Sequence, residues 1–226
     1  MNRRLLRPLP GSLLTRRAVC VAAGAALVAP ACRPREAEAR RPRAPRANLY
    51  ACEGCEAIFE RRHEDLPQET SIADGAERGE RLRLEGVVLA ADGKGPAANV
   101  VIYAHHTDAN GLYSRGTPET EWSRRHGKLR AWVKTGRDGR YAFDTIKPAP
   151  YPDRTMPAHI HLTVLEAGRR PYWIDDVVFD GEFAVTPDYR QKQELRGGDG
   201  IVRLTRRDGI LIARRDIVLE PHDDRH

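Results

Sequence analysis

The chain has 226 residues, of which 38 are Lys or Arg and 32 are Asp or Glu, giving a formal net charge of +6. This length predicts one domain of ordinary size, or two at most, and a composition with 40% hydrophobic and 31% charged residues is typical of a soluble protein. No apolar run reaches the roughly 18–20 residues that a membrane-spanning helix needs, so we expect no integral membrane protein.

The positive charge is concentrated at the N-terminus. Residues 1–47 contain eleven Arg and two Glu, whereas the remaining 179 residues contain 27 basic and 30 acidic residues. The part expected to fold is therefore slightly acidic, and we expect no nucleic acid partner.

Residues 1–31 have the three parts of an export signal. Arginines precede a short apolar stretch, residues 18–28, and small residues follow it at 29–31. Arg16 and Arg17 stand directly before the apolar stretch and favour a twin-arginine signal, with an ordinary Sec signal as the alternative. We therefore expect an exported protein, in the periplasm or associated with the cell surface.

Cys32 follows this signal and is a candidate lipidation site, which would tether the protein to a membrane. Residues 32–48 are rich in Ala, Pro and Arg and predict a disordered linker. Residues 49–81 form an N-terminal extension that contains Cys52 and Cys55. In an exported protein their spacing favours a local disulfide, and free thiols or a metal shared between two chains are the alternatives.

From residue 82 onward, short apolar segments alternate with turn residues. We expect strands over residues 82–89, 99–104, 132–135, 140–146, 159–165, 177–179, 200–204 and 209–219. Helices are expected only around residues 56–64 and 187–195. Short strands joined by Gly, Asp and Pro turns predict an all-β fold, an antiparallel β-sandwich over residues 82–226 with few short helices.

The strongest chemical signal is Pro157-Ala158-His159-Ile160-His161. Side chains alternate faces along a strand, so His159 and His161 point the same way and Ile160 points into the other layer. Two imidazoles side by side on a rigid backbone form half of a metal site, and a solvated sheet face is the alternative. The apolar flanks favour the metal, because two unpaired imidazoles are costly to bury.

Other polar residues lie where loops meet the predicted strands. Tyr151 stands between two prolines that fix its backbone, and Tyr113 ends a loop that follows the strand over residues 99–104. His126 and His222 lie in basic or terminal stretches and are expected to be solvated. Three residues that close the strand before Tyr113 are pocket candidates, with exposed loop positions as the alternative: His105, His106 and Asp108.

The segments 136–152 and 156–161 resemble the intradiol ring-cleavage dioxygenases, in particular the core of protocatechuate dioxygenase and its short exported relatives. The likeness extends over residues 82–219, and its most diagnostic parts are the Tyr-Pro pair at 151–152 and the Pro-x-His-x-His motif. This resemblance implies a β-sandwich that holds one non-haem ferric ion per chain. At the matching positions the implied iron ligands are Tyr113, Tyr151, His159 and His161.

The resemblance also implies a reaction. A small aromatic diol and O2 would be the substrates, and the catechol ring would open between its two hydroxylated carbons to give a cis,cis-muconate-type diacid. Tyr151 would act as a base for one catechol proton. Two phenolates suit a hard ferric ion, whose charge favours loss of the phenol protons. The sequence specifies no oligomeric state.

Two positions depart from the family pattern and are further pocket candidates. Met156 stands where an arginine usually precedes the histidine motif, and Arg154 is the catalytic candidate to replace it. Asp176 stands where many members have glutamine, which would place a negative charge near a bound catecholate.

Three other interpretations compete. Residues 86–101 and 135–143 are also typical of transthyretin-like and carboxypeptidase-regulatory-like domains, which are non-catalytic binding modules. The departures at positions 156 and 176 suit a metal-binding relative that has lost catalysis. A cupin is disfavoured, because no histidine between His161 and His222 could complete its metal site.

Overall fold

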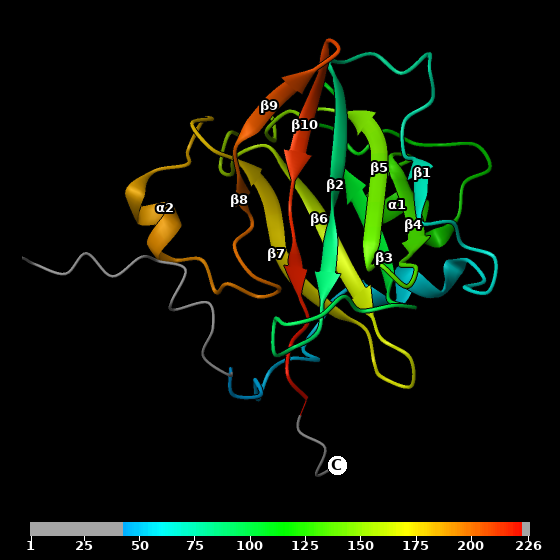
Figure 1. The fold of residues 1–226 in the computed structure, drawn as a ribbon. Helices are drawn as coiled ribbons and strands as arrows, with labels where there is room; N and C mark the ends of the chain where they lie inside the picture. Colours follow the sequence, from blue (N-terminus) through cyan, green and yellow to red (C-terminus); the bar gives the residue numbers. More distant parts are fainter. Residues whose placement is uncertain (1–42, 223–226) are drawn as a thin grey trace, which may run out of the picture. The chain divides into compact units, whose positions relative to one another are not determined.

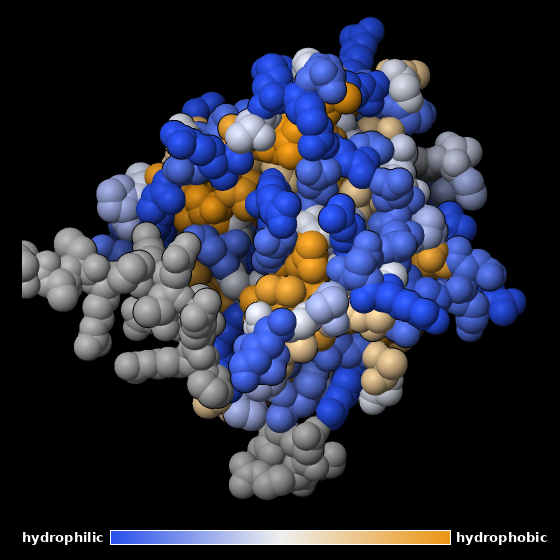
Figure 2. All heavy atoms as spheres, in the orientation of Figure 1, coloured by the Kyte–Doolittle hydropathy of each residue, from blue (hydrophilic) through white to orange (hydrophobic). Residues whose placement is uncertain are grey.

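A computed structural model describes residues 43–222 of the chain. The predicted export signal over residues 1–31, the lipidation candidate Cys32 and most of the predicted linker lie outside the described residues. Within residues 43–222, no helix has the length and apolar character needed to cross a membrane. Hydrophilic side chains cover most of the face drawn in Figure 2, with apolar side chains in separate patches between them.

The described domain is a β-sandwich (Figure 1), which confirms the all-β fold expected from the sequence. The first sheet has the order β1-β5-β2-β10-β9, with β11 also paired to β2. Its strands are β1 (Glu69–Ser71), β2 (Arg81–Leu89), β5 (Arg140–Ile146), β9 (Leu204–Arg207), β10 (Ile210–Arg214) and β11 (Ile217–Val218).

The second sheet has the order β4-β3-β6-β7-β8. Its strands are β3 (Val101–His106), β4 (Arg130–Lys134), β6 (His159–Leu165), β7 (Tyr172–Phe179) and β8 (Ile201–Val202). The helices are short: the 3-10 helix η2 (Cys55–Glu60) and the α-helices α1 (Glu121–His126) and α2 (Pro187–Gln191).

Both sheets are mixed, whereas the sequence predicted antiparallel pairing throughout. Most pairs are antiparallel, but β1 pairs with β5, β10 and β11 pair with β2, and β8 pairs with β7 in parallel. Parallel neighbours cannot be joined by a hairpin and need a long connection. The chain between β2 and β10 contains every strand of the second sheet, and it provides such a connection.

Alternation along β6 separates the core from the outer face of the second sheet. Ile160, Leu162 and Val164 are buried in the main core between the sheets, as the period of two predicts. The intervening residues, which include both histidines of the motif, therefore face away from that core. A second apolar cluster, in which η2 packs on this outer face, contains Ala57, Ile58, Val101, Tyr103, Trp132 and Leu165.

Three elements differ from the expectation. The three-residue β1 has no apolar pattern and is held by backbone pairing with β5. The helix α1 lies in a charged segment, where a capping box between Thr120 and Ser123 begins it. The strand β7 starts at Tyr172, whereas the sequence predicted a start at residue 177. The first part was missed because Asp175 and Asp176 interrupt the apolar pattern.

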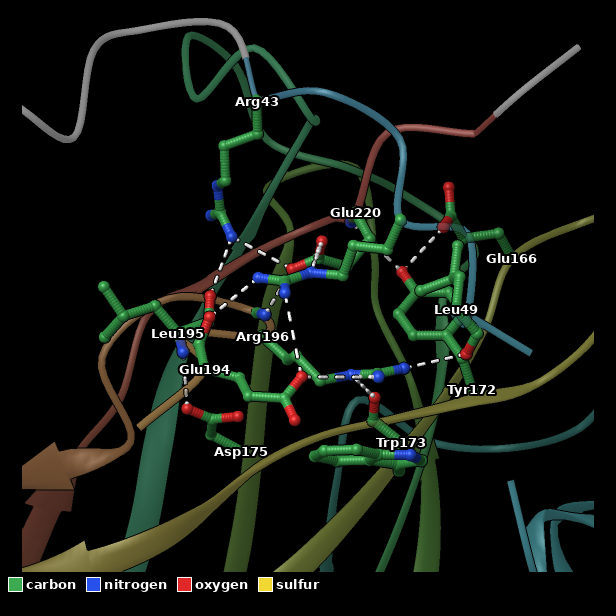
Figure 3. Close-up of polar contacts among 12 residues, drawn as sticks. Arg43, Leu49, Glu166, Tyr172, Trp173, Asp175, Glu194, Leu195, Arg196 and Glu220 are labelled. Atoms are coloured by element: carbon green, nitrogen blue, oxygen red, sulfur yellow. Dashed lines mark hydrogen bonds and ion pairs between the residues drawn. The ribbon is translucent and has the colours of Figure 1, made fainter. Parts of the chain in front are cut away.

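The end of the predicted linker is bound to the domain (Figure 3). Arg43 Nη1 and Arg46 Nε donate to the Glu220 carboxylate at 2.9 and 2.8 Å. The Glu220 side chain is 0% exposed, and its Oε1 also accepts from the backbone nitrogen of Gly197. The disordered linker expected through residue 48 is therefore corrected at its C-terminal end, because two of its arginines pair with a buried carboxylate.

Candidate metal centre

Two tyrosines and two histidines converge on the outer face of the second sheet. The hydroxyl oxygens of Tyr113 and Tyr151 are 2.9 Å apart, and the Tyr151 oxygen lies 3.1 Å from Nε2 of His159 and 3.5 Å from Nε2 of His161. Nε2 of His161 lies 2.9 Å from the Tyr113 oxygen and 3.1 Å from Nε2 of His159. These are the four residues that the resemblance implies as iron ligands.

The two tyrosines come from loops that are bonded to each other. Thr107 Oγ1 donates to the carbonyl oxygen of Ala149 at 2.8 Å, and the Ala149 nitrogen donates to the carbonyl oxygen of Asp108 at 3.1 Å. Gly111 has φ 80°, and a Cβ at this position would overlap the carbonyl oxygen of Pro150. A glycine at 111 therefore lets the Tyr113 loop approach the Tyr151 segment.

The second nitrogen of each histidine fixes its tautomer. His159 Nδ1 is 2.7 Å from the carbonyl oxygen of Pro157, and His161 Nδ1 is 2.9 Å from Oδ1 of Asp176. Both partners are acceptors, so each Nδ1 donates, and each ring in its neutral form presents an Nε2 lone pair to the cluster.

The donor set fits a cation. With both imidazoles neutral, as metal ligands are, the four facing atoms have only the two phenol protons among them, yet they make five contacts of 2.9–3.5 Å. At most two of these contacts are hydrogen bonds, and the others bring lone pairs together. A cation at the centre of atoms this far apart would lie about 2 Å from each, the usual length of a bond between a metal and imidazole nitrogen.

The protonation of the tyrosines depends on such a cation. Burial, followed by the neighbouring Tyr151 hydroxyl, raises the pKa of Tyr113, and burial raises the pKa of Tyr151. Without a positive charge both phenols are therefore protonated. A bound metal ion is the largest local charge in such a site and favours the phenolate forms.

Asp176 is hydrogen-bonded to His161 on the side of the ring that faces away from the cluster. Its carboxylate lies within 4.8 Å of donor atoms of both histidines, so distance alone would allow it to be a metal ligand. Its Oδ1 accepts from His161 Nδ1, however, which makes it an orienting partner of the ring. Burial acts to raise the pKa of Asp176, but its interaction with His161 holds that pKa below its usual value.

A cavity of about 460 Å³ adjoins this cluster and reaches His161. Three of the predicted pocket residues line it, namely His105, Met156 and Asp176. The disulfide between Cys52 and Cys55 stands at its edge through Cys52. The cavity is the space from which a small molecule could approach the cluster.

Two predicted pocket residues lie elsewhere. His106 faces the core between the sheets, where Nδ1 donates to the carbonyl oxygen of Thr107 and Nε2 contacts Thr145 Oγ1, both at 2.7 Å. Burial lowers the pKa of His106 to about 4. Asp108 does not line the cavity either: its Oδ1 accepts from the nitrogens of Asn110 and Leu112, which orders the loop that ends in Tyr113.

Arg154 does not supply the arginine that is missing at position 156. Its guanidinium lies 4.0 Å from the ring centroid of Phe183, and it is not among the residues that line the cavity. The catalytic role expected for Arg154 therefore has no contact with the cluster to support it.

The sequence missed the second wall of the cavity. His126, expected to be solvated, stacks on His105 at 4.0 Å between ring centroids and bonds to the Tyr103 hydroxyl through Nδ1 at 2.9 Å. The sequence did hold one signal for this wall: side chains alternate along a strand, which places Tyr103 and His105 on the same face of β3. His222, also expected to be solvated, contacts Tyr50 and Glu166.

Fold and site together define a β-sandwich protein with a tyrosine–histidine centre suited to a hard metal ion. A family profile described as Dioxygenase matches residues 57–196, which is more than half of the chain. The chain belongs to the intradiol dioxygenase family, whose members use non-haem iron(III).

Individual relatives are distant. Catechol 1,2-dioxygenase 2 of Acinetobacter lwoffii is 29% identical over 149 residues, which cover 54% of this chain and 52% of that protein. The match therefore spans about half the length of this relative.

Solved structures show the same fold. The dioxygenase domain of a dioxygenase–carbohydrate-binding fusion from Streptomyces sp. SirexAA-E has a TM-score of 0.52 at 24% identity, covering 70% of this chain and 90% of that one. Catechol 1,2-dioxygenase from Acinetobacter sp. ADP1 has a TM-score of 0.52 at 22% identity, covering 70% of this chain and 60% of that one.

Proposed function

We propose that the protein is a non-haem Fe(III) intradiol dioxygenase that uses O2 to cleave a catechol-type ring between its two hydroxylated carbons, giving a cis,cis-muconate-type diacid. The proposal rests on one observation above all: two phenol oxygens and two imidazole nitrogens face one another at 2.9–3.5 Å with too few protons to pair them. Family membership supports the same conclusion.

The histidines and Tyr151 have different roles in this proposal. When bound, a ferric ion supplies the Lewis acidity that favours the deprotonated diol and the electron-accepting chemistry for reaction with O2. His159 and His161 stand on β6 with both Nδ1 atoms bonded, so their rings keep a fixed orientation. The Tyr151 oxygen, on a loop, hydrogen-bonds within the cluster and, as the phenolate that a bound cation would favour, could accept a proton from a diol hydroxyl.

We also propose that the protein acts outside the cytoplasm. The export signal predicted over residues 1–31 and the disulfide between Cys52 and Cys55 support this location, since disulfides persist in oxidising compartments.

One observation favours a second candidate, a metal-binding relative without catalysis. Met156 brings no charge to the cavity, and Arg154 is turned to Phe183, so no arginine of this segment lies beside a bound diol. Absorption and oxygen uptake separate the two candidates.

The test uses full-length protein loaded with ferric iron. We expect a broad visible absorption band from charge transfer between the tyrosines and iron, and oxygen uptake with at least one of catechol, protocatechuate and hydroxyquinol. Tyr113→Phe and Tyr151→Phe should each weaken or shift the band and lower the uptake rate. Tyr50→Phe, at a half-buried tyrosine bonded to His222, is the control and should leave both unchanged.

Two results would count against the proposal. If the iron-loaded protein shows the visible band but takes up no oxygen, it is the metal-binding relative without catalysis. An iron-loaded protein without the band, or with a band that neither tyrosine substitution alters, would contradict the four-residue centre itself and favour a binding module.

A further inference from the structure

Building on the proposed function, we propose that this site selects catechols with a neutral or positively charged ring substituent over carboxylated catechols, and that Glu194 reads the substituent's charge. Glu194 is the carboxylate of the cavity wall that has no partner within hydrogen-bond distance among the described residues.

The position of the cavity makes its lining relevant to the substrate. It reaches His161 and Asp176 at one end, and Met156 and Trp173 form part of its wall. A diol bound at the cluster from this side would place its ring substituents against these residues and against the segment 192–194.

The lining offers no buried cation to a substrate carboxylate. Lys192 is its only Lys or Arg among the described residues, and its Nζ lies 2.7 Å from Oδ2 of Asp188 in a surface pair whose side chains are both 72% exposed. Position 156 is an uncharged methionine, 36% exposed, and the Arg154 guanidinium is stacked on Phe183.

Two further arginines stand behind the wall, and both are bonded to backbone. Arg196 donates to the carbonyl oxygens of Trp173 and Leu49, and its guanidinium lies 3.7 Å from the Trp173 ring centroid (Figure 3). Arg215 donates to the carbonyl oxygens of Asp175 and Arg196. Both side chains are buried, so neither can turn into the cavity.

Four carboxylates line the same cavity, and three have a partner within hydrogen-bond distance. Glu53 pairs with Arg125 at 2.7 Å, Asp175 Oδ2 accepts from the nitrogen of Leu195 at 2.7 Å, and Asp176 bonds to His161. The fourth is Glu194.

Glu194 retains acceptor capacity. Its Oε2 lies 3.7 Å from Arg46 Nη1 and 3.8 Å from Arg196 Nη1, which are ion-pair contacts beyond hydrogen-bond distance, and its side chain is 48% exposed. Its backbone is held in place, because Arg46 Nη2 donates to the Glu194 carbonyl oxygen at 2.8 Å. The side chain therefore extends from a fixed backbone, and its carboxylate has no hydrogen-bond partner among the described residues.

A tyrosine in the same wall lies near two of these carboxylates. Tyr189 also lines the cavity, and burial first, then the charges of Asp176 and Asp175, raise the pKa of its phenol. An anionic substituent would lose hydration here without gaining a buried cation, whereas an ammonium group would gain Glu194. A neutral substituent neither loses the hydration of a charge nor gains an ion pair. The expected order of affinity is therefore ammonium, then neutral, then carboxylate.

The test is an anaerobic titration of the iron-loaded protein, in which diol binding shifts the visible band and no turnover occurs. The probes are dopamine, catechol and protocatechuate at low ionic strength. We expect protocatechuate to bind at least about tenfold more weakly than catechol, and dopamine to bind more tightly than catechol by up to about fivefold, the range for a partly exposed ion pair.

Variants assign the effect to residues. Glu194→Gln should remove the advantage of dopamine over catechol and leave catechol binding unchanged, and Met156→Arg should narrow the gap between protocatechuate and catechol. Glu80→Gln is the matched control, since Glu80 is also an ion-paired glutamate, is 47% exposed and does not line the cavity.

The titration separates failure of this inference from failure of the proposed function. Protocatechuate binding as tightly as catechol, or a dopamine advantage that survives Glu194→Gln, would overturn this inference while leaving the proposed function intact. No shift with any of the three diols would instead overturn the proposed function, and the inference with it.

Discussion

At the scale of single residues, Asp176 determines which nitrogen of His161 faces the cluster. A carboxylate 2.9 Å from Nδ1 keeps the proton on that nitrogen and leaves the Nε2 lone pair available. The negative charge that the sequence placed near the substrate therefore accepts a hydrogen bond from His161 Nδ1.

We expect Asp176→Leu to lower iron affinity by about 10–100-fold, the usual effect of removing such a partner from a ligating histidine. Asp176→Asn keeps an acceptor oxygen and should retain most of the affinity. Competition with a chelator measures both, and Asp144→Asn, bonded to Arg83 on the other sheet, is the control. Equal losses in the Leu and Asn variants would show that charge, rather than ring orientation, is what Asp176 contributes.

Residues also show where sequence reasoning succeeds and where it fails. His159 and His161 could be placed because a strand flanked by apolar residues has only two faces, and Ile160 takes the core face. His105 and His106 are neighbours at the end of β3, so the same rule sends them to opposite faces. Only His105 reaches the cavity, and the sequence did not show which of the two would.

At the scale of elements, the centre combines one strand with two loops. The strand β6 presents both histidines, and the loops supply the tyrosines through a contact that only a glycine at 111 permits. The Tyr-Pro and His-x-His motifs locate these segments in the sequence. The contact between them depends on the backbone conformation of residue 111, for which a single glycine in a turn is a weak signal.

Gly111→Ala should prevent the two loops from meeting. A left-handed alanine costs about 1–2 kcal/mol by itself, and the Cβ would also overlap the Pro150 carbonyl oxygen. We expect a large loss of the visible band and of bound iron, measured together with the free energy of unfolding.

The matched control is Gly168→Ala. Gly168 has φ 71° but no atom within 4 Å of a built Cβ, so this variant keeps the strain without the overlap. It should lose about 1–2 kcal/mol and bind iron normally. If both variants kept their iron, the two loops would not depend on Gly111.

At the scale of the described domain, residues from its two ends are joined. Arg43 and Arg46 bind Glu220, and they also donate to the backbone of residues 194 and 195 beside the cavity. Composition predicted a linker here because it has little to bury. The partner is 174 residues away in sequence from Arg46, and no local pattern could reveal it.

Replacing both arginines by alanine should destabilise the domain by about 3–5 kcal/mol, because the Glu220 carboxylate would remain buried without a cation. Urea unfolding of the full chain measures this difference. Arg62→Ala, which removes an 85% exposed arginine 3.5 Å from Glu64, should change stability by less than about 1 kcal/mol. Similar values for the two variants would mean that residues 43–46 do not hold the C-terminal segment.

The packing of Ile160 between two metal-facing histidines has a consequence for the order of assembly. The backbone that presents these rings is fixed by hydrophobic burial and by pairing with β3 and β7, none of which involves an ion. The polypeptide can thus reach its native topology before iron arrives, with half of the coordination sphere prearranged. Metal binding would then complete a scaffold that is already folded, and apoprotein and holoprotein should each unfold in a single transition.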